Sequence, residues 1–126
     1  MKNKVTIGIA DDHSLMLDTL KSLLTKNDYD VTIEACNGYD LITQIENALK
    51  KPGICFVDGR MPNMDGVETV KATKAKWPEI KVISYSNDIH KGLEMIQNGA
   101  DVYLTKNSSE ESIIKCITEL LFDIEP

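Results

Sequence analysis

The chain has 126 residues, 42% of them hydrophobic and 27% charged, and a formal net charge of −6 at pH 7. These values are typical of one globular domain with its own core, and the negative charge argues against direct binding to nucleic acid or to an anionic membrane. Because no apolar run is long enough to cross a membrane and no signal peptide opens the chain, we expect a cytoplasmic protein whose three scattered cysteines are reduced thiols.

Five short apolar runs are spaced along the chain, and each has the pattern of a buried or half-buried strand. They cover residues 5–10, 29–36, 54–57, 80–86 and 101–105. Turn residues such as Asn37-Gly38 and Pro52-Gly53 separate them from the segments that follow or precede.

A segment with apolar residues at helical spacing follows each predicted strand. The residues expected on the buried helix faces are Met16, Leu20, Leu23 and Leu24, then Leu41, Ile45, Ala48 and Leu49, then Val67, Val70 and Trp77, then Ile89, Leu93 and Ile96, and finally Ile113, Ile114, Ile117, Leu120 and Leu121. The last helix is predicted to begin at Ser108, because Glu111 three residues later fits a capping box. Strict alternation of strands and helices predicts an α/β fold, with a parallel sheet covered by helices on both faces.

Polar side chains come directly after four of the five predicted strands. Asp11 and Asp12 follow the first strand, Asp58 the third, Ser86 the fourth and Lys106 the fifth. Right-handed crossovers place the carboxyl ends of parallel strands at one edge of the sheet, which is where ligands bind in such folds. We therefore expect these side chains to form one site.

The chemistry of this set suits a phosphoryl group and a metal ion. Three carboxylates in one pocket repel one another unless a cation neutralises them, and Mg²⁺ is a hard cation that takes oxygen ligands. Lys106 adds a positive charge and Ser86 a hydroxyl donor for phosphoryl oxygens. Phosphoryl transfer needs mainly positioning and charge neutralisation, and a carboxylate can act as its nucleophile.

The motifs at these strand ends resemble those of a known family. They are Asp11-Asp12, Asp58-x-x-Met61-Pro62-x-Met64-Asp65-Gly66, Ser86, and Gly99-Ala100-x-x-Tyr103-Leu104-x-Lys106. In this order the set resembles a response-regulator receiver domain of two-component signalling, similar to chemotaxis regulators, over essentially the whole chain. The resemblance implies a flavodoxin-like (βα)5 three-layer sandwich with a five-stranded parallel sheet of order 2-1-3-4-5.

The resemblance also implies roles for the phosphoryl-binding residues. Asp58 would accept a phosphoryl group from a phosphohistidine on a sensor histidine kinase, and Ser86 and Lys106 would contact the phosphoryl oxygens. Tyr103 would change rotamer together with Ser86 as the switch. A domain of this kind is a signalling phosphoacceptor that assists its own phosphoryl transfer and hydrolysis, and we do not expect it to be an enzyme.

A magnesium site is implied by the same resemblance. Asp12 and Asp58, with the main-chain carbonyl of Arg60, would bind Mg²⁺, and Asp11 would act largely through a metal-bound water. The competing interpretation is that Asp11 and Asp12 simply cap the first helix, where carboxylates favour the positive end of the helix dipole.

The sequence departs from the family pattern in the segment from Ser86 to Gly99, which is about two residues shorter than in typical receivers. The missing length falls in the fourth helix or in the loop before it. Asn87 is bulkier than the small residue often found after the switch hydroxyl, and we expect it to narrow access to Asp58. Our hypothesis is that Asn87, Arg60 and Asp88 tune the lifetime of the phosphoryl group.

Other functions remain open at the sequence level. A receiver-like module that signals by protein docking without phosphorylation would share these motifs, whereas a haloacid-dehalogenase-like phosphatase would need an acid at the position of Arg60. Residues 1–122 are predicted to form the receiver, and 123–126 a tail or the start of a linker. The output is either transcription regulation through a helix-turn-helix domain outside this chain or docking of a stand-alone receiver, with possible homodimerisation through the fourth helix, fifth strand and fifth helix.

Overall fold

Five parallel strands form the central sheet of the computed structural model, which describes residues 5–124. The strands are β1 (Thr6–Ala10), β2 (Asp30–Ala35), β3 (Ile54–Asp58), β4 (Lys81–Tyr85) and β5 (Val102–Leu104). Their order across the sheet is β2-β1-β3-β4-β5, which confirms the predicted topology.

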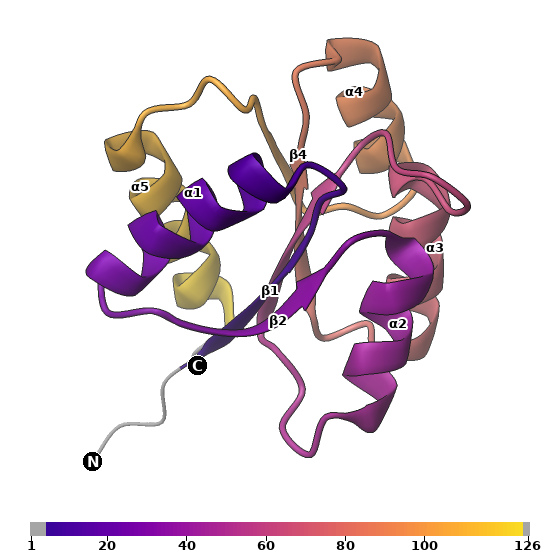
Figure 1. Ribbon diagram of the computed structural model, residues 1–126, viewed down its shortest axis with the longest axis horizontal. Coiled ribbons are helices and arrows are strands. Elements are labelled where there is room, and N and C mark those ends of the chain that lie inside the picture. The colour runs from indigo at the N-terminus through magenta and orange to yellow at the C-terminus, as the bar shows by residue number, and fades with distance from the viewer. Residues whose placement is uncertain (1–4, 125–126) are drawn as a thin grey trace.

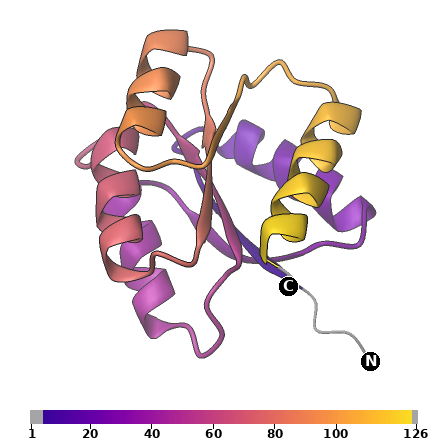
Figure 2. The same ribbon diagram turned by 180° about the vertical axis from the view of Figure 1, so that it is seen from behind.

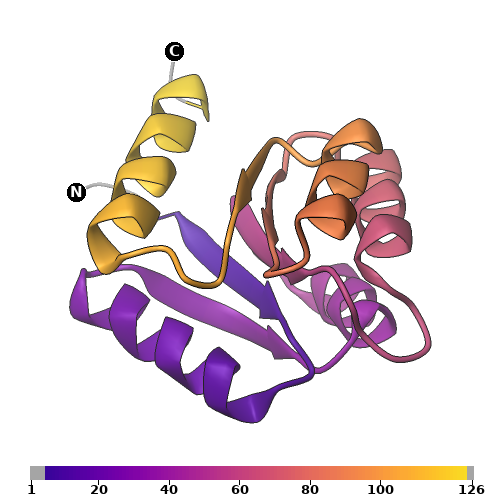
Figure 3. The same cartoon turned by 90° about the horizontal axis from the view of Figure 1, so that it is seen from above.

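Five helices cover the two faces of this sheet, as Figures 1 and 2 show. They are α1 (Ser14–Lys26), α2 (Gly38–Asn47), α3 (Gly66–Lys76), α4 (Ile89–Gln97) and α5 (Glu110–Ile124). Helices α1 and α5 lie on one face and α2, α3 and α4 on the other, so that the view in Figure 3 shows three layers. An apolar cluster fills each interface, one around Phe56 and Ile117 and the other around Val57 and Leu41.

The strand register brings the carboxyl ends of four strands to the same level. Ala10 pairs with Val57, so the residue after β1 lies level with Asp58 at the end of β3. Asp58 pairs with Tyr85, and Tyr85 in turn pairs with Leu104. The polar residues that end or follow β1, β3, β4 and β5 are therefore neighbours across the sheet, as expected.

The start of α5 differs from the prediction. The hydroxyl of Ser109 accepts a hydrogen bond from the backbone N–H of Ser112 at 3.1 Å, and the helix begins at Glu110. The predicted cap at Ser108 is wrong by one residue, since Ser109 caps the helix and the Ser108 N–H donates to the carbonyl of Thr105 in the preceding turn. The helix continues to Ile124, across the boundary predicted after residue 122, while 125–126 lie outside the described residues.

The end of α2 also comes earlier than the apolar pattern predicts. The helix ends at Asn47, Ala48 has extended backbone angles, and Leu49 is fully exposed instead of lying on the buried face. The ammonium group of Lys51 donates hydrogen bonds to the carbonyls of Ile45, Glu46 and Ala48. This side chain satisfies the last carbonyls of the helix, which otherwise lack partners, and so stabilises the early end.

All three cysteines lie within the described residues. Cys36 is exposed, Cys55 and Cys116 are buried, and no disulfide joins them in the part of the chain that the structure describes, as expected for reduced thiols. None of the helices within residues 5–124 has both the length and the apolar content that crossing a bilayer requires.

Candidate functional site

Three carboxylates gather at the carboxyl edge of the sheet. Asp11 and Asp12 follow β1 and Asp58 ends β3, and each offers an oxygen to a group whose ligand atoms all lie within 4.8 Å of one another. Asp11 and Asp58 are buried, whereas Asp12 faces solvent. The adjacent His13 belongs to the same group of atoms, which the sequence motifs did not indicate.

Lys106 lies against the two buried carboxylates. Its Nζ atom is 2.7 Å from Asp11 Oδ2 and 3.3 Å from Asp58 Oδ1, and its side chain is 8% exposed. Burial alone lowers the pKa of Lys106, but the hydrogen bond to Asp11 and the charges of both carboxylates raise it above its ordinary value. One fixed ammonium group therefore faces two buried carboxylates, and the pocket retains excess negative charge.

Asp58 is less well compensated than Asp11. Burial, followed by the charge of Asp11, raises the pKa of Asp58 to about 6 despite the opposing effect of Lys106. Its second oxygen, Oδ2, is buried and has no hydrogen-bond partner among the described residues. A buried carboxylate oxygen without a partner is costly, and a hard divalent cation with oxygen ligands would satisfy it. The residues present therefore fit Mg²⁺.

Ser86 and Tyr103 close the β4–β5 side of the site. Ser86 is buried after β4, and its hydroxyl accepts a hydrogen bond from the backbone N–H of Asp88 at 3.0 Å. The hydroxyl of Tyr103 in β5 donates to the main-chain carbonyl of Ser86 at 2.9 Å. Tyr103 thus points inward, toward the loop that contains Ser86.

A pocket of about 230 Å³ opens over these groups, and it is lined by His13, Asp58, Arg60, Ser86, Asn87, Asp88 and Lys106. Gly59 lies close to the side chains of Ser86 and Lys91, because a Cβ atom there would lie 3.0 Å from Ser86 Oγ and 2.7 Å from Lys91 Cγ. The close approach of these side chains favours glycine directly after the candidate phosphoacceptor, because a larger residue would have to displace Lys91 and Ser86. The sequence analysis did not identify this role of Gly59 or the contact made by Lys91.

Asn87, which was expected to narrow the pocket, also makes a structural contact. Its side-chain oxygen accepts a hydrogen bond from the backbone N–H of Lys106 at 3.1 Å, which ties the β4–α4 loop to the β5–α5 loop. Arg60 donates from Nε and Nη2 to Asp88 Oδ2 at 2.9 and 2.5 Å. The three residues proposed from the sequence to tune phosphoryl lifetime therefore all line the pocket, although two of them are paired with each other.

Asp65 is not among the residues that line the pocket, and its side chain has a structural role. Its side chain accepts a hydrogen bond from the backbone N–H of Glu68 and so caps α3 at its N-terminus. An N-terminal cap of this type satisfies one of the donors that a helix leaves free at its start.

The sequence profile described as "Response regulator receiver domain" matches residues 7–118 of the chain. The chain belongs to the response-regulator receiver family. Receiver domains are signalling phosphoacceptors that take phosphate from histidine kinases, and they are not classical enzymes. They bind Mg²⁺ at an acidic pocket, and the corresponding carboxylates are clustered in this receiver domain.

Curated relatives of this receiver domain include proteins of about its own length and proteins about twice as long. It is 33% identical over 113 residues to the uncharacterized transcriptional regulatory protein YhcZ of Bacillus subtilis, covering 86% of this chain and 51% of that protein. It is 30% identical over 111 residues to the chemotaxis protein CheY of Listeria monocytogenes, covering 86% of this chain and 92% of that protein. The chain thus spans about half the length of YhcZ, and likewise 50% of the transcriptional regulatory protein DegU of Brevibacillus brevis.

Solved structures show the same fold. A CheY-like receiver domain from Methanospirillum hungatei superposes with a TM-score of 0.87 at 24% identity, covering 97% of both chains. The receiver domain of the putative response regulator NarL from Mycobacterium tuberculosis superposes with a TM-score of 0.83 at 26% identity, covering 94% of this chain and 96% of that chain.

Proposed function

We propose that Asp58 is the phosphoacceptor of this receiver domain and takes its phosphoryl group from a phosphohistidine on a sensor histidine kinase. The observation that supports this most directly is the position of Asp58 at the end of β3, in a pocket where Lys106 Nζ lies 3.3 Å from its carboxylate. A carboxylate that is otherwise uncompensated and lies beside a fixed ammonium group can act as a nucleophile toward phosphorus.

The transfer exchanges one bond to phosphorus for another. A carboxylate oxygen of Asp58 attacks the phosphorus, the N–P bond of the phosphohistidine breaks, and the imidazole nitrogen keeps the electron pair. Lys106 would offset negative charge on the phosphoryl oxygens, and Ser86 would donate its hydroxyl to one of them after leaving its contacts with the backbone of Asp88. Water attack on the acyl phosphate later returns Asp58 to its carboxylate form and releases inorganic phosphate.

Asp11, Asp12 and Asp58, with the main-chain carbonyl of Arg60, are the groups that we propose for binding Mg²⁺. The ion supplies positive charge that offsets the carboxylates and the phosphoryl oxygens. The buried Asp58 oxygen without a partner and the clustering of carboxylate oxygens within 4.8 Å support this assignment.

Tyr103 and Ser86 are proposed as the switch that links phosphorylation to the output surface. The Tyr103 hydroxyl binds the Ser86 carbonyl, so a movement of Ser86 toward a phosphoryl group would alter the position of the ring. We propose transcription regulation as the output, because YhcZ and DegU are named transcriptional regulatory proteins and are about twice as long as this chain. Docking of a stand-alone receiver is the alternative, since CheY has nearly the length of this chain.

Four expectations from the sequence stay predictions. They are the kinase partner, a homodimer through α4, β5 and α5, the cytoplasmic location, and the boundary of the domain at residues 1–122. The side chains of Ile89 and Leu93 on α4 are exposed, so placing them on the buried face of the helix was wrong, and their exposure is consistent with a docking surface of that kind.

The test is the intact mass of the protein after incubation with Mg²⁺ and acetyl phosphate, for the wild type and for Asp58→Ala. We expect one added phosphoryl group on the wild type, none on Asp58→Ala, and none when the metal is chelated. A wild-type protein without an adduct would contradict phosphorylation and favour a module that signals by docking alone.

A further inference from the structure

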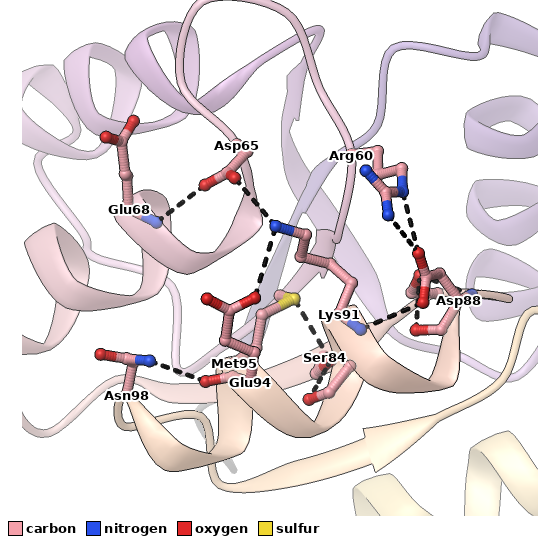
Figure 4. Close-up of polar contacts among 11 residues, drawn as sticks. Arg60, Asp65, Glu68, Ser84, Asp88, Lys91, Glu94, Met95 and Asn98 are labelled. Carbon is pink, nitrogen blue, oxygen red and sulfur yellow. Dashed lines mark hydrogen bonds and ion pairs between the residues drawn. The ribbon is translucent and has the colours of Figure 1, made fainter.

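The N-terminal turn of α4 is tied to the β3–α3 loop (residues 59–65) by two ion pairs, which Figure 4 shows side by side. Arg60 of the loop donates to Asp88 Oδ2 from Nε at 2.9 Å and from Nη2 at 2.5 Å. Lys91 of the helix reaches back to Asp65 Oδ2 at 3.2 Å. The loop that follows the phosphoacceptor is therefore attached to α4 at two points.

Asp88 is the residue on which several of these contacts converge. Its Oδ1 atom accepts the backbone N–H of Lys91 at 3.1 Å and caps α4, while Oδ2 accepts from Arg60. Its own backbone N–H donates to the hydroxyl of Ser86. Any change in the ion pair with Arg60 therefore acts directly on the first turn of α4 and on the backbone next to Ser86.

Arg60 is placed to change partners. Both Arg60 and Asp88 line the pocket that contains Asp58, and the Arg60 side chain is 71% exposed, so packing does not hold the guanidinium in one position. A phosphoryl group brings a charge of roughly −1.5 to −2 at neutral pH, with three acceptor oxygens. Arginine binds phosphate through two parallel N–H donors, and the charge on phosphate exceeds that on one carboxylate.

We propose that Arg60 exchanges Asp88 for the phosphoryl group when Asp58 is phosphorylated, and that this exchange releases one of the two ties on α4. The inference rests on the proposed function of Asp58. The new phosphoryl charge attracts the guanidinium and repels the Asp88 carboxylate, so both effects act in the same direction. The ion pair between Lys91 and Asp65 remains, so the first turn of α4 can rotate while this contact keeps it attached to the β3–α3 loop.

The test compares phosphorylation by acetyl phosphate at saturating Mg²⁺ in Arg60→Gln, Asp88→Asn and the double variant. Asparagine caps helices as well as aspartate, so Asp88→Asn keeps the cap of α4 and removes only the charge that holds Arg60. Since an exposed ion pair contributes only modestly, we expect Asp88→Asn to lower the half-saturating acetyl phosphate concentration by about two- to fivefold. Arg60→Gln should raise it by a similar factor.

The double variant tests the exchange itself. If Asp88→Asn acts mainly by freeing Arg60, its effect should be much smaller in a protein that already has Arg60→Gln, where only the direct repulsion between Asp88 and the phosphoryl group is removed. Glu34→Gln is the matched control, because it removes one negative charge from a carboxylate that pairs with Lys21 on a separate part of the surface. We expect this control to phosphorylate as the wild type does.

A spectroscopic readout follows the same exchange in the wild-type protein. In NMR spectra, the chemical shifts of the Arg60 Nε–H and of the Lys91 backbone amide, which donates to Asp88, should both change when acetyl phosphate and Mg²⁺ are added. In Asp88→Asn the Arg60 signal should already have moved away from its Asp88-paired position before any phosphodonor is present. Equal kinetics in all variants, or an effect of Asp88→Asn that is just as large with Arg60→Gln as without it, would overturn the exchange. Absence of a phosphoryl adduct on the wild type would instead overturn the proposed function of Asp58.

Discussion

At Asp58, the surroundings oppose the ionised form of the side chain. Burial has the largest effect, the charge of Asp11 adds to it, and Lys106 compensates only in part, so the pKa rises to about 6. In the unfolded chain this carboxyl ionises near its ordinary pKa of 3.8. Between these two values the folded state binds more protons than the unfolded state does. The stabilisation of the folded state by the protonated Asp58 carboxyl is therefore fully present below about pH 4. It is lost as the pH rises through the pKa that Asp58 has in the folded state.

This linkage predicts a pH-dependent difference between the metal-free wild type and Asp58→Ala. We expect the free energy of unfolding of the wild type, relative to the variant, to fall by about 2 kcal/mol between pH 4 and pH 7. Denaturant unfolding in the presence of a chelator measures it at each pH. Any cavity left by Ala is the same at every pH and cancels from the comparison, so a difference that stays constant would contradict the raised pKa.

At the scale of elements, the contact between α4 and β5 depends on Gly92. A Cβ atom at this position would lie 2.3 Å from Cε1 of Tyr103, which is closer than any real contact of this kind. The tyrosine ring therefore occupies the space that a side chain at position 92 would fill. The absence of a side chain at Gly92 permits the inward position in which Tyr103 binds the Ser86 carbonyl.

We expect Gly92→Ala to displace the Tyr103 ring outward and to break its 2.9 Å hydrogen bond with Ser86. Alanine favours a helix by about 1 kcal/mol over glycine, which partly offsets the lost contacts, so the position of the ring should change more than the stability does. Fluorine NMR of fluorotyrosine-labelled protein measures this, with Tyr103→Phe used to assign the signal. An unchanged Tyr103 signal in Gly92→Ala would show that the ring does not need this space.

At the scale of the whole molecule, the carboxylates come together only after β1 and β3 have paired in the sheet. Asp11 and Asp58 are 47 positions apart in the chain, yet their oxygens belong to one group within 4.8 Å. The unfolded chain does not hold this arrangement, so a metal ion that binds it adds its binding free energy to the stability of the folded state.

We expect Mg²⁺ to raise the free energy of unfolding of the wild type at pH 7.5, by about 2.7 kcal/mol when its concentration is a hundred times the dissociation constant. The effect should be much smaller at pH 5, where Asp58 is largely protonated, and in Asp58→Ala. Thermal unfolding with and without chelator measures it, at constant ionic strength. An equal gain in wild type and variant would mean that the metal acts elsewhere.

The amino-acid sequence by itself determined the architecture and which polar residues converge at the strand ends. Apolar periodicity distinguishes strands from helices locally, and the handedness of crossovers then brings all strand carboxyl ends to one edge. The convergence of Asp11, Asp58, Ser86 and Lys106 needed no further information, because each residue directly follows or ends a strand. The apolar pattern was less informative at helix ends, as the exposed Leu49 shows.

Only the tertiary structure decided how the side chains pair. Three hydrogen bonds show this. They join Arg60 to Asp88, Lys91 to Asp65, and the Asn87 side chain to the Lys106 backbone, and the paired residues are 28, 26 and 19 positions apart in the chain. Each depends on rotamers and on distances between loops of different strand–helix units. The position of Tyr103 over Gly92 is decided in the same way, because it requires α4 to lie against β5 at one particular height. Hydrophobic periodicity contains no information about such distances, which arise only when the helices pack on the sheet.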